Sequence, residues 1–101
     1  MEQQPNYYSI IPANVRYDKR LKANEKLLFS EIIALSNKQG YCHAKNSYFA
    51  DLYQVTKVTI STWINHLKEC GYLKIKNTYK GKQIVGRTII PMAEPIKENL
   101  N

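Results

Sequence analysis

The sequence has few of the residues that build disulfide frameworks and metal centres. It contains only two cysteines and two histidines in 101 residues. Cys42 and Cys70 are separated too widely to suggest a stapled scaffold, and Cys42 stands beside His43 without the paired spacing of a zinc site. His66 stands alone and is expected to be a flanking residue or a phosphate contact. We therefore expect two reduced thiols, no metal and no disulfide.

Features of enzymes and of membrane-targeted proteins are also missing. The four glycines form no phosphate-binding loop, and no paired carboxylates or nucleophile with a base can be assembled. No apolar run suits a signal peptide or reaches transmembrane length. The sequence therefore predicts a cytoplasmic, single-domain protein that is not an enzyme and uses no cofactor.

Acidic residues are scarce, and they are scarcest in one stretch. The formal net charge is +7, and residues 56–90 hold seven Lys or Arg against the single acid Glu69, which makes that stretch +6. A polyanion is the expected partner, and double-stranded DNA fits best. A membrane surface is the competing anion, but no helix has a wide apolar face opposite a lysine-rich one, and no lipidation motif is present.

Two helices joined by a tight turn are predicted between Asn46 and Leu73. The second should begin after Thr56, whose hydroxyl can accept from free amides of the first turn, and should end before Gly71. At 100° per residue, one side carries an apolar stripe that should face the core. The stripe consists of Ile60, Trp63, Ile64, Leu67 and Cys70. This layout is typical of a helix-turn-helix.

The other side of the second helix carries small, polar or cationic groups. Such groups permit close approach to the major groove and hydrogen bonding to base edges. The candidate base contacts are Lys57, Val58, Thr59, Ser61, Thr62 and Asn65. The alternative is an ordinary amphipathic surface helix, on which the same residues would only be hydrated.

A β-hairpin is expected to follow the helices. Residues 72–77 alternate apolar and cationic side chains, Thr78–Lys82 can form a turn around Gly81, and Gln83–Ile90 can return as the partner strand, with Gly86 as a bulge. Helix-turn-helix and hairpin together make a winged helix. The candidate contacts to the DNA backbone are Ser47, Thr56, Lys76, Tyr79, Lys80, Lys82 and Arg87. The alternative is a hairpin whose lysines serve only to keep a sheet edge soluble.

The N-terminal half is expected to form the scaffold. Residues 23–37 have the spacing of an amphipathic helix, and Tyr41–Ala44 is expected to be a third strand of the sheet. Asn46 or Ser47 should cap the helix that runs to Leu52, with Phe49 and Leu52 pointing inward. Tyr7–Ile11 should be extended, and Pro12–Asp18 should form a turn or short helix.

These elements predict an α+β winged helix-turn-helix with three helices and a small antiparallel sheet whose β-hairpin is the wing. We assign residues 1–22 to an extended N-terminal arm and 23–90 to the DNA-binding domain. Residues 91–101 are expected to be a linker or disordered tail.

Residues 7–90 resemble the N-terminal winged-helix domains of replisome organisers and replication initiators of Gram-positive phages and plasmids, including those with DnaD-like C-terminal parts. Three blocks carry the resemblance: YSIIPANVRYDKRL, EKLLFSEIIALSNKQGYC and VTKVTISTWINHLKECGYL. The first is distinctive, whereas many winged-helix regulators share the outline of the last. The family usually has Ser or Thr where Lys22 stands, which moves the expected helix start to Asn24, and often has Arg near Thr62.

The resemblance implies binding to a replication origin. Such initiators continue into a second domain that recruits replication proteins or oligomerises, so this chain is either an excised DNA-binding head or a free-standing small protein. Two other functions stay open. The chain can act as a repressor that binds a promoter palindrome as a homodimer, or as a winged helix that docks on a host protein.

Overall fold

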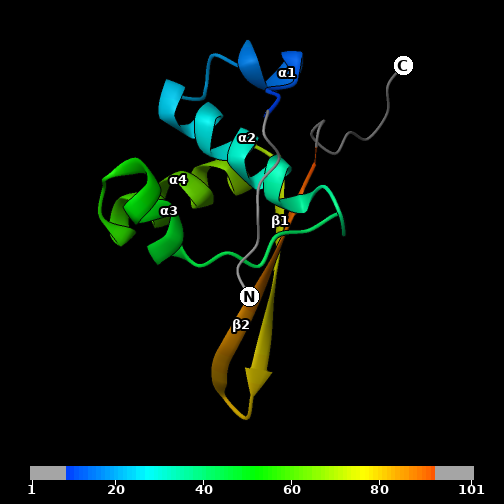
Figure 1. The fold of residues 1–101 in the computed structure, drawn as a ribbon, viewed down its shortest axis with the longest axis vertical. Helices are drawn as coiled ribbons and strands as arrows, with labels where there is room; N and C mark the ends of the chain where they lie inside the picture. The colour runs from blue at the N-terminus through cyan, green and yellow to red at the C-terminus, as the bar shows by residue number, and fades with distance from the viewer. Residues whose placement is uncertain (1–8, 93–101) are drawn as a thin grey trace.

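The computed structural model describes residues 9–92 and shows an α+β winged helix-turn-helix. Its elements are α1 (Ala13–Arg16), α2 (Ala23–Ser36), α3 (Asn46–Tyr53), α4 (Lys57–Glu69), β1 (Leu73–Lys80) and β2 (Gln83–Pro91). The two strands form an antiparallel hairpin that projects away from the helices (Figure 1). The described residues thus contain one helix more than the three expected.

The additional helix is α1, a single turn within the segment Pro12–Asp18 that was expected to be a turn or short helix. Pro12 precedes its first residue, where a fixed φ and a missing N–H are tolerated. Val15 and Leu21 are buried in the core, so this part of residues 1–22 packs on the domain. Residues 7 and 8 of the expected extended stretch, and most of the expected tail 91–101, lie outside the described residues.

Helix α2 begins at Ala23, and the expected start at Asn24 is wrong. Lys22 is the N-cap, and its backbone N–H donates to Oε1 of Glu25 (2.8 Å). Lysine has no side-chain acceptor for the reciprocal bond, so this is half of a capping box. The carboxylate of Glu25 therefore supplies the side-chain contact that caps the start of the helix.

The core lies between α2, the helix-turn-helix and the base of the hairpin. Leu28, Phe29 and Ile32 of α2 are fully buried against it. Phe49 of α3 points inward as expected, but Leu52 is 47% exposed, so the expected inward position of Leu52 is wrong. The inward arc of α3 runs instead through Ala50 and the partly buried Tyr53, and Leu52 lies about 100° from the middle of that arc.

Cys42 and Cys70 are both buried, and neither forms a disulfide. Burial raises the pKa of each thiol, which keeps both protonated and unreactive at neutral pH. Their role in this fold is therefore to pack in the core.

The expected third strand, Tyr41–Ala44, is wrong as a regular strand. Only Cys42 pairs with the hairpin, through two backbone hydrogen bonds of 2.8 Å to Ile89. The next antiparallel pair would join Ala44 and Arg87, but side chains take those backbone acceptors. Nη2 of Arg87 donates to the carbonyl of Ala44 (2.8 Å), and Nδ1 of His43 lies 3.3 Å from the carbonyl of Arg87. The ladder therefore ends after one bridge.

An ionic network ties the N-terminal segment to Tyr72, the residue just before β1. The carboxylate of Asp18 accepts from the guanidinium of Arg20 (2.7 and 3.0 Å), from the backbone N–H of Arg20 (2.9 Å) and from the hydroxyl of Tyr72 (2.7 Å). The hydrogen bonds from Arg20 are the main cause that holds the pKa of Asp18 well below its usual range, against an opposing effect of burial.

We expect Asp18→Asn to lower the free energy of unfolding by about 1 kcal/mol at pH 7, because it removes the charge that pairs with Arg20. The effect is small because the Arg20 side chain is 58% exposed and water screens the pair. A depressed folded-state pKa makes this stabilisation complete above the unfolded pKa of about 3.9. It is lost as the pH falls below that value toward the folded pKa. Urea titrations between pH 2.5 and 7 should show the two proteins converging in acid. A constant difference across that range would contradict the assignment.

Candidate nucleic-acid interface

Helix α4 has the boundaries that its sequence predicts. Oγ1 of Thr56 accepts from the backbone N–H of Thr59 (3.1 Å), which caps the N-terminus. At the other end Gly71 has φ +89°, and the N–H groups of Gly71 and Tyr72 donate to the carbonyls of Lys68 and Leu67. This is the Schellman arrangement, which needs a left-handed residue after the helix and which glycine adopts without strain.

The turn between α3 and α4 is tight. Gln54 has φ +58° and ends α3, and the N–H of Val55 donates to the carbonyl of Ala50 (3.0 Å). Thr56 then caps α4 directly. Two helices separated by three residues, packed on each other, form the helix-turn-helix.

The inward side of α4 packs against the core. Ile60, Ile64 and Leu67 are at most 3% exposed, and Trp63 is partly buried against the same cluster. The predicted stripe is therefore the packed side. Of its five members, Trp63 is the one that retains substantial exposure, so truncating it removes less buried surface than a fully enclosed residue would.

His66 has a different role from the one expected. Its Nδ1 lies 2.8 Å from Oε2 of Glu25, whose side chain is only 4% exposed. Glu25 also caps α2, so one buried carboxylate holds both the start of α2 and the third turn of α4. His66 therefore belongs to the scaffold, and its ring nitrogen Nδ1 is already engaged.

The outward side of α4 brings together five of the six candidate base contacts. Lys57, Val58, Ser61, Thr62 and Asn65 fall within an arc of about 140° at 100° per residue. Four of the six are exposed and two, Thr59 and Ser61, are partly buried. Thr59 lies about 60° outside this arc, and its Oγ1 accepts from Oγ1 of Thr56 (3.0 Å). Thr59 therefore belongs to the helix cap more than to the outward side of α4.

The hairpin is longer and its turn shorter than expected. Lys80 pairs with Gln83, so only Gly81 and Lys82 form the loop, and the five-residue turn Thr78–Lys82 is wrong. Gly81 has φ +65°, the sign that primed hairpin turns require at their first loop position. The register shifts after Thr78, which pairs with Gly86 while Tyr79 pairs with Ile84. The expected bulge is present, and Val85 is its extra residue.

The candidate backbone contacts of the wing lie on both faces of the hairpin. Side chains alternate along a strand, so Lys74, Lys76 and Lys80 share one face of β1. Asn77 and Tyr79 share the other, together with Arg87, which pairs with Asn77. Beyond Lys76 all residues of the hairpin up to Val85 are exposed. The structure therefore separates Lys76 and Lys80 from Tyr79 and Arg87, and Lys82 lies in the loop.

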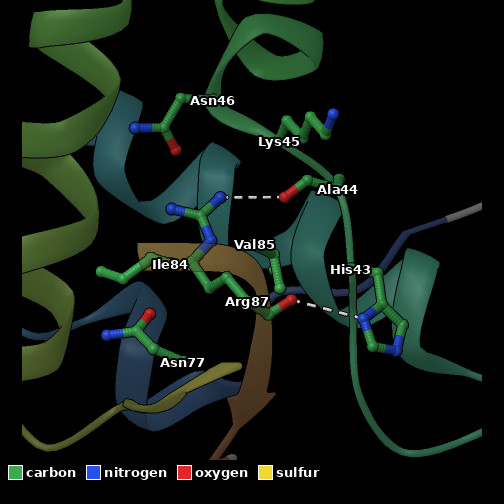
Figure 2. Close-up of a pocket in the computed structure, with 9 residues that line it drawn as sticks. His43, Ala44, Lys45, Asn46, Asn77, Ile84, Val85 and Arg87 are labelled. Carbon is green, nitrogen blue, oxygen red and sulfur yellow. Dashed lines mark hydrogen bonds between the residues drawn. The ribbon is translucent and has the colours of Figure 1, made fainter. Parts of the chain in front are cut away.

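Arg87 lies in an open pocket of ≈ 580 Å³ between the hairpin and the start of α3 (Figure 2). Its guanidinium points toward the loop before α3 and donates to Ala44, and burial lowers the pKa of Arg87. Arg87 is therefore at the base of the wing, away from the loop of Gly81 and Lys82 at its tip.

Other residues that line this pocket were not among the predicted contacts. Lys45 and Asn46 come from the start of α3, His43 from the loop and Asn77 from β1 (Figure 2). Oδ1 of Asn46 is buried without a hydrogen-bond partner. The position of Lys45 directly before a helix start could have been recognised in the sequence. The position of Asn77 beside the pocket depends on the strand register of the hairpin and could not. Ser47 is exposed in the first turn of α3.

Residues 9–92 contain no cluster of three or more His, Cys, Asp or Glu side chains that suits a metal ion. Over the same range, every helix is too short or too polar to cross a bilayer.

The sequence model of a family described as "Helix-turn-helix domain" matches residues 19–73, just over half of the chain. That range includes α2, both helices of the motif and the first residue of the hairpin. No curated protein and no solved structure was found to match.

Proposed function

We propose, from the premise that this chain belongs to the helix-turn-helix domain family, that it binds double-stranded DNA in a sequence-specific manner and has no enzymatic activity. The family indicates DNA binding. The finer claim is that α4 enters the major groove, with the hairpin as a wing on the adjoining backbone or minor groove. A DNA partner would place the protein in the cytoplasm.

The outward side of α4 carries this proposal. It presents hydrogen-bonding and small groups over its first three turns, while the opposite side is held in the core by Ile60, Ile64 and Leu67. Its Thr56 cap leaves the first turn open to solvent, which is the part of a recognition helix that contacts bases. The +6 charge of residues 56–90 supplies attraction to phosphate.

The two-sided wing supports insertion into a groove. A hairpin lying flat on one phosphate strand would use lysines on one face only. Lys76 and Lys80 on one face, with Tyr79 and Arg87 on the other, suit a hairpin flanked by a phosphate strand on each side. Lys82 in the loop adds a cation at the tip.

The start of α3 is the proposed second backbone contact. The N–H groups of Asn46 and Ser47 lie in the first turn, where they have no helical partner, and the helix dipole favours an anion there. Lys45 and Arg87 line the same pocket and add positive charge. A phosphate seated here would also offset the cost of burying the Arg87 guanidinium.

Resemblance to initiators favours the origin-binding head of a phage or plasmid replication initiator, acting with replication proteins through a further domain. A second candidate is a repressor that binds a palindrome as a homodimer. The third, docking on a host protein, is less well supported because the exposed hairpin and the loop at its tip are basic.

Fluorescence anisotropy with labelled duplexes tests the proposal. Fragments of the replicon that encodes this chain would be titrated at 50 and 200 mM salt with random duplex as competitor. Competitor-resistant binding to repeated sites supports origin recognition, and binding to one promoter palindrome supports a repressor. Binding that competitor abolishes at both salt concentrations would refute sequence-specific recognition and direct attention to protein partners.

Lys80→Ala and Lys82→Ala should each weaken binding to all duplexes and reduce the salt slope by about one, because each phosphate contact releases counterions. Lys38→Ala is the matched control, since it removes the same charge from an exposed position after α2. The slope is read from anisotropy titrations at four salt concentrations. Equal slopes for the wing variants and the control would remove the wing from the interface.

A further inference from the structure

Two of the hydroxyl-bearing candidates on α4, one on its outward side and one in its cap, are already engaged in hydrogen bonds, which the sequence alone did not reveal. Oγ1 of Thr62 donates to the carbonyl of Val58 (3.1 Å), one turn earlier in the helix. Oγ1 of Thr59 accepts from Thr56 within the cap. A threonine whose hydroxyl is used in this way offers its methyl group to a ligand. Thr62 therefore presents an apolar contact.

Val58 gives the same face a second apolar group. It is 75% exposed in the first turn of α4, although valine is a residue that usually packs in the interior. Thr62 follows Val58 by four residues and so lies on the same side of the helix, one turn along. The leading end of the proposed recognition helix thus carries two adjacent methyl-bearing side chains, with the cation Lys57 next to Val58.

Asn65 continues this line as its hydrogen-bonding member. It is exposed, and no side-chain hydrogen bond to it is present within residues 9–92. Val58, Thr62 and Asn65 follow at i, i+4 and i+7, and span about 10 Å along the helix axis, or roughly three base-pair steps. Helix α4 contains no arginine, the side chain most often used to read guanine.

We propose that α4 reads an A·T-containing half-site, with thymine methyl groups against Val58 and Thr62 and an adenine bonded by the amide of Asn65. In the major groove, thymine is the base that presents a methyl group, and an asparagine amide matches the N6 and N7 edge of adenine. This inference rests on the proposed DNA-binding function and names the bases that its recognition helix prefers.

The test uses the whole chain and a duplex pool with a randomised 20-base-pair core. Selection with the wild-type chain first yields the preferred duplex. Each thymine of that duplex is then replaced in turn by deoxyuridine, which removes only the methyl group, and binding is measured by anisotropy. For at least one thymine we expect about a three- to fivefold loss of affinity, the size expected for one buried methyl group.

Protein variants then identify which residue contacts the thymine methyl group. Val58→Ala should bind the thymine and deoxyuridine duplexes within twofold of each other. Val85→Ala, the same truncation at an exposed position of the wing, should retain the difference. Thr62→Val keeps the methyl group and should bind like the wild type, whereas Thr62→Ser, which loses it, should not. Circular dichroism checks that each variant is folded.

Three results would overturn the proposal, and they differ in what else they affect. Tight, selective binding that no deoxyuridine substitution changes would exclude methyl reading and leave DNA binding intact. A selection that enriches no sequence at all would overturn this inference together with the proposed function. Selected duplexes that contain only G·C pairs opposite α4 would likewise reject the A·T preference.

Discussion

Replacing Glu25 with alanine is expected to lower the free energy of unfolding by about 2 to 3 kcal/mol, because it removes a helix cap and the hydrogen-bond partner of His66 together. The carboxylate is almost fully enclosed, and it accepts from the backbone of Lys22 while contacting Nδ1 of His66. Its loss leaves the start of α2 uncapped and the ring of His66 without a partner. Urea denaturation followed by circular dichroism gives the difference.

Two further variants separate these effects. His66→Ala keeps the α2 cap and should cost less than Glu25→Ala, and the double variant then measures the coupling between the two side chains. Glu69→Ala removes an exposed acid from α4 and should change the stability by less than about 0.5 kcal/mol. A similarly small effect for Glu25→Ala would show that the carboxylate is not what joins α2 to α4.

Asn65→Ala is expected to remove discrimination at one base pair, with a loss of about 1 to 3 kcal/mol for the preferred duplex and little change for random DNA. The salt slope should stay the same, because an amide contact to a base releases no counterion. Anisotropy titrations with the selected duplex and its single-pair variants measure both quantities.

Asn37→Ala is the matched control, because Asn37 is an exposed asparagine just after α2 and outside the proposed interface. It should bind every duplex like the wild type. If Asn65→Ala instead weakened all duplexes equally, Asn65 would position the helix on the backbone and would not read a base. The Lys80 and Lys82 variants provide the pattern expected for such positioning contacts.

Helix α4 and the class of fold were predictable because their determinants are local. Thr56, the apolar stripe and Gly71 mark the start, the packed side and the end of α4 within a span of sixteen residues. The same holds for the hairpin, where alternation, glycine and β-branched residues are read directly along the chain. Capping, helical spacing and turn preference act between neighbouring residues, so no knowledge of the tertiary structure is needed.

Errors arose where one local pattern allowed more than one outcome. Leu52 and Ala50 are both apolar positions of a short helix, and which of them faces inward depends on where α3 packs. Tyr41–Ala44 has the character of a strand, but the side chains of Arg87 and His43 take the carbonyls of Ala44 and Arg87, so the pairing stops at Cys42. Both outcomes depend on groups more than thirty residues away or on another element.

In the candidate interface, too, some features follow from the sequence and others only from the tertiary structure. By itself, the sequence determined which residue types are available to DNA and on which side of α4 they lie, because helical periodicity follows from local geometry. Only the tertiary structure decided that His66 is held by Glu25, that Arg87 lines a pocket with α3 and that the wing lysines lie apart from Tyr79. These depend on packing and strand register, which bring together groups that are distant in the chain.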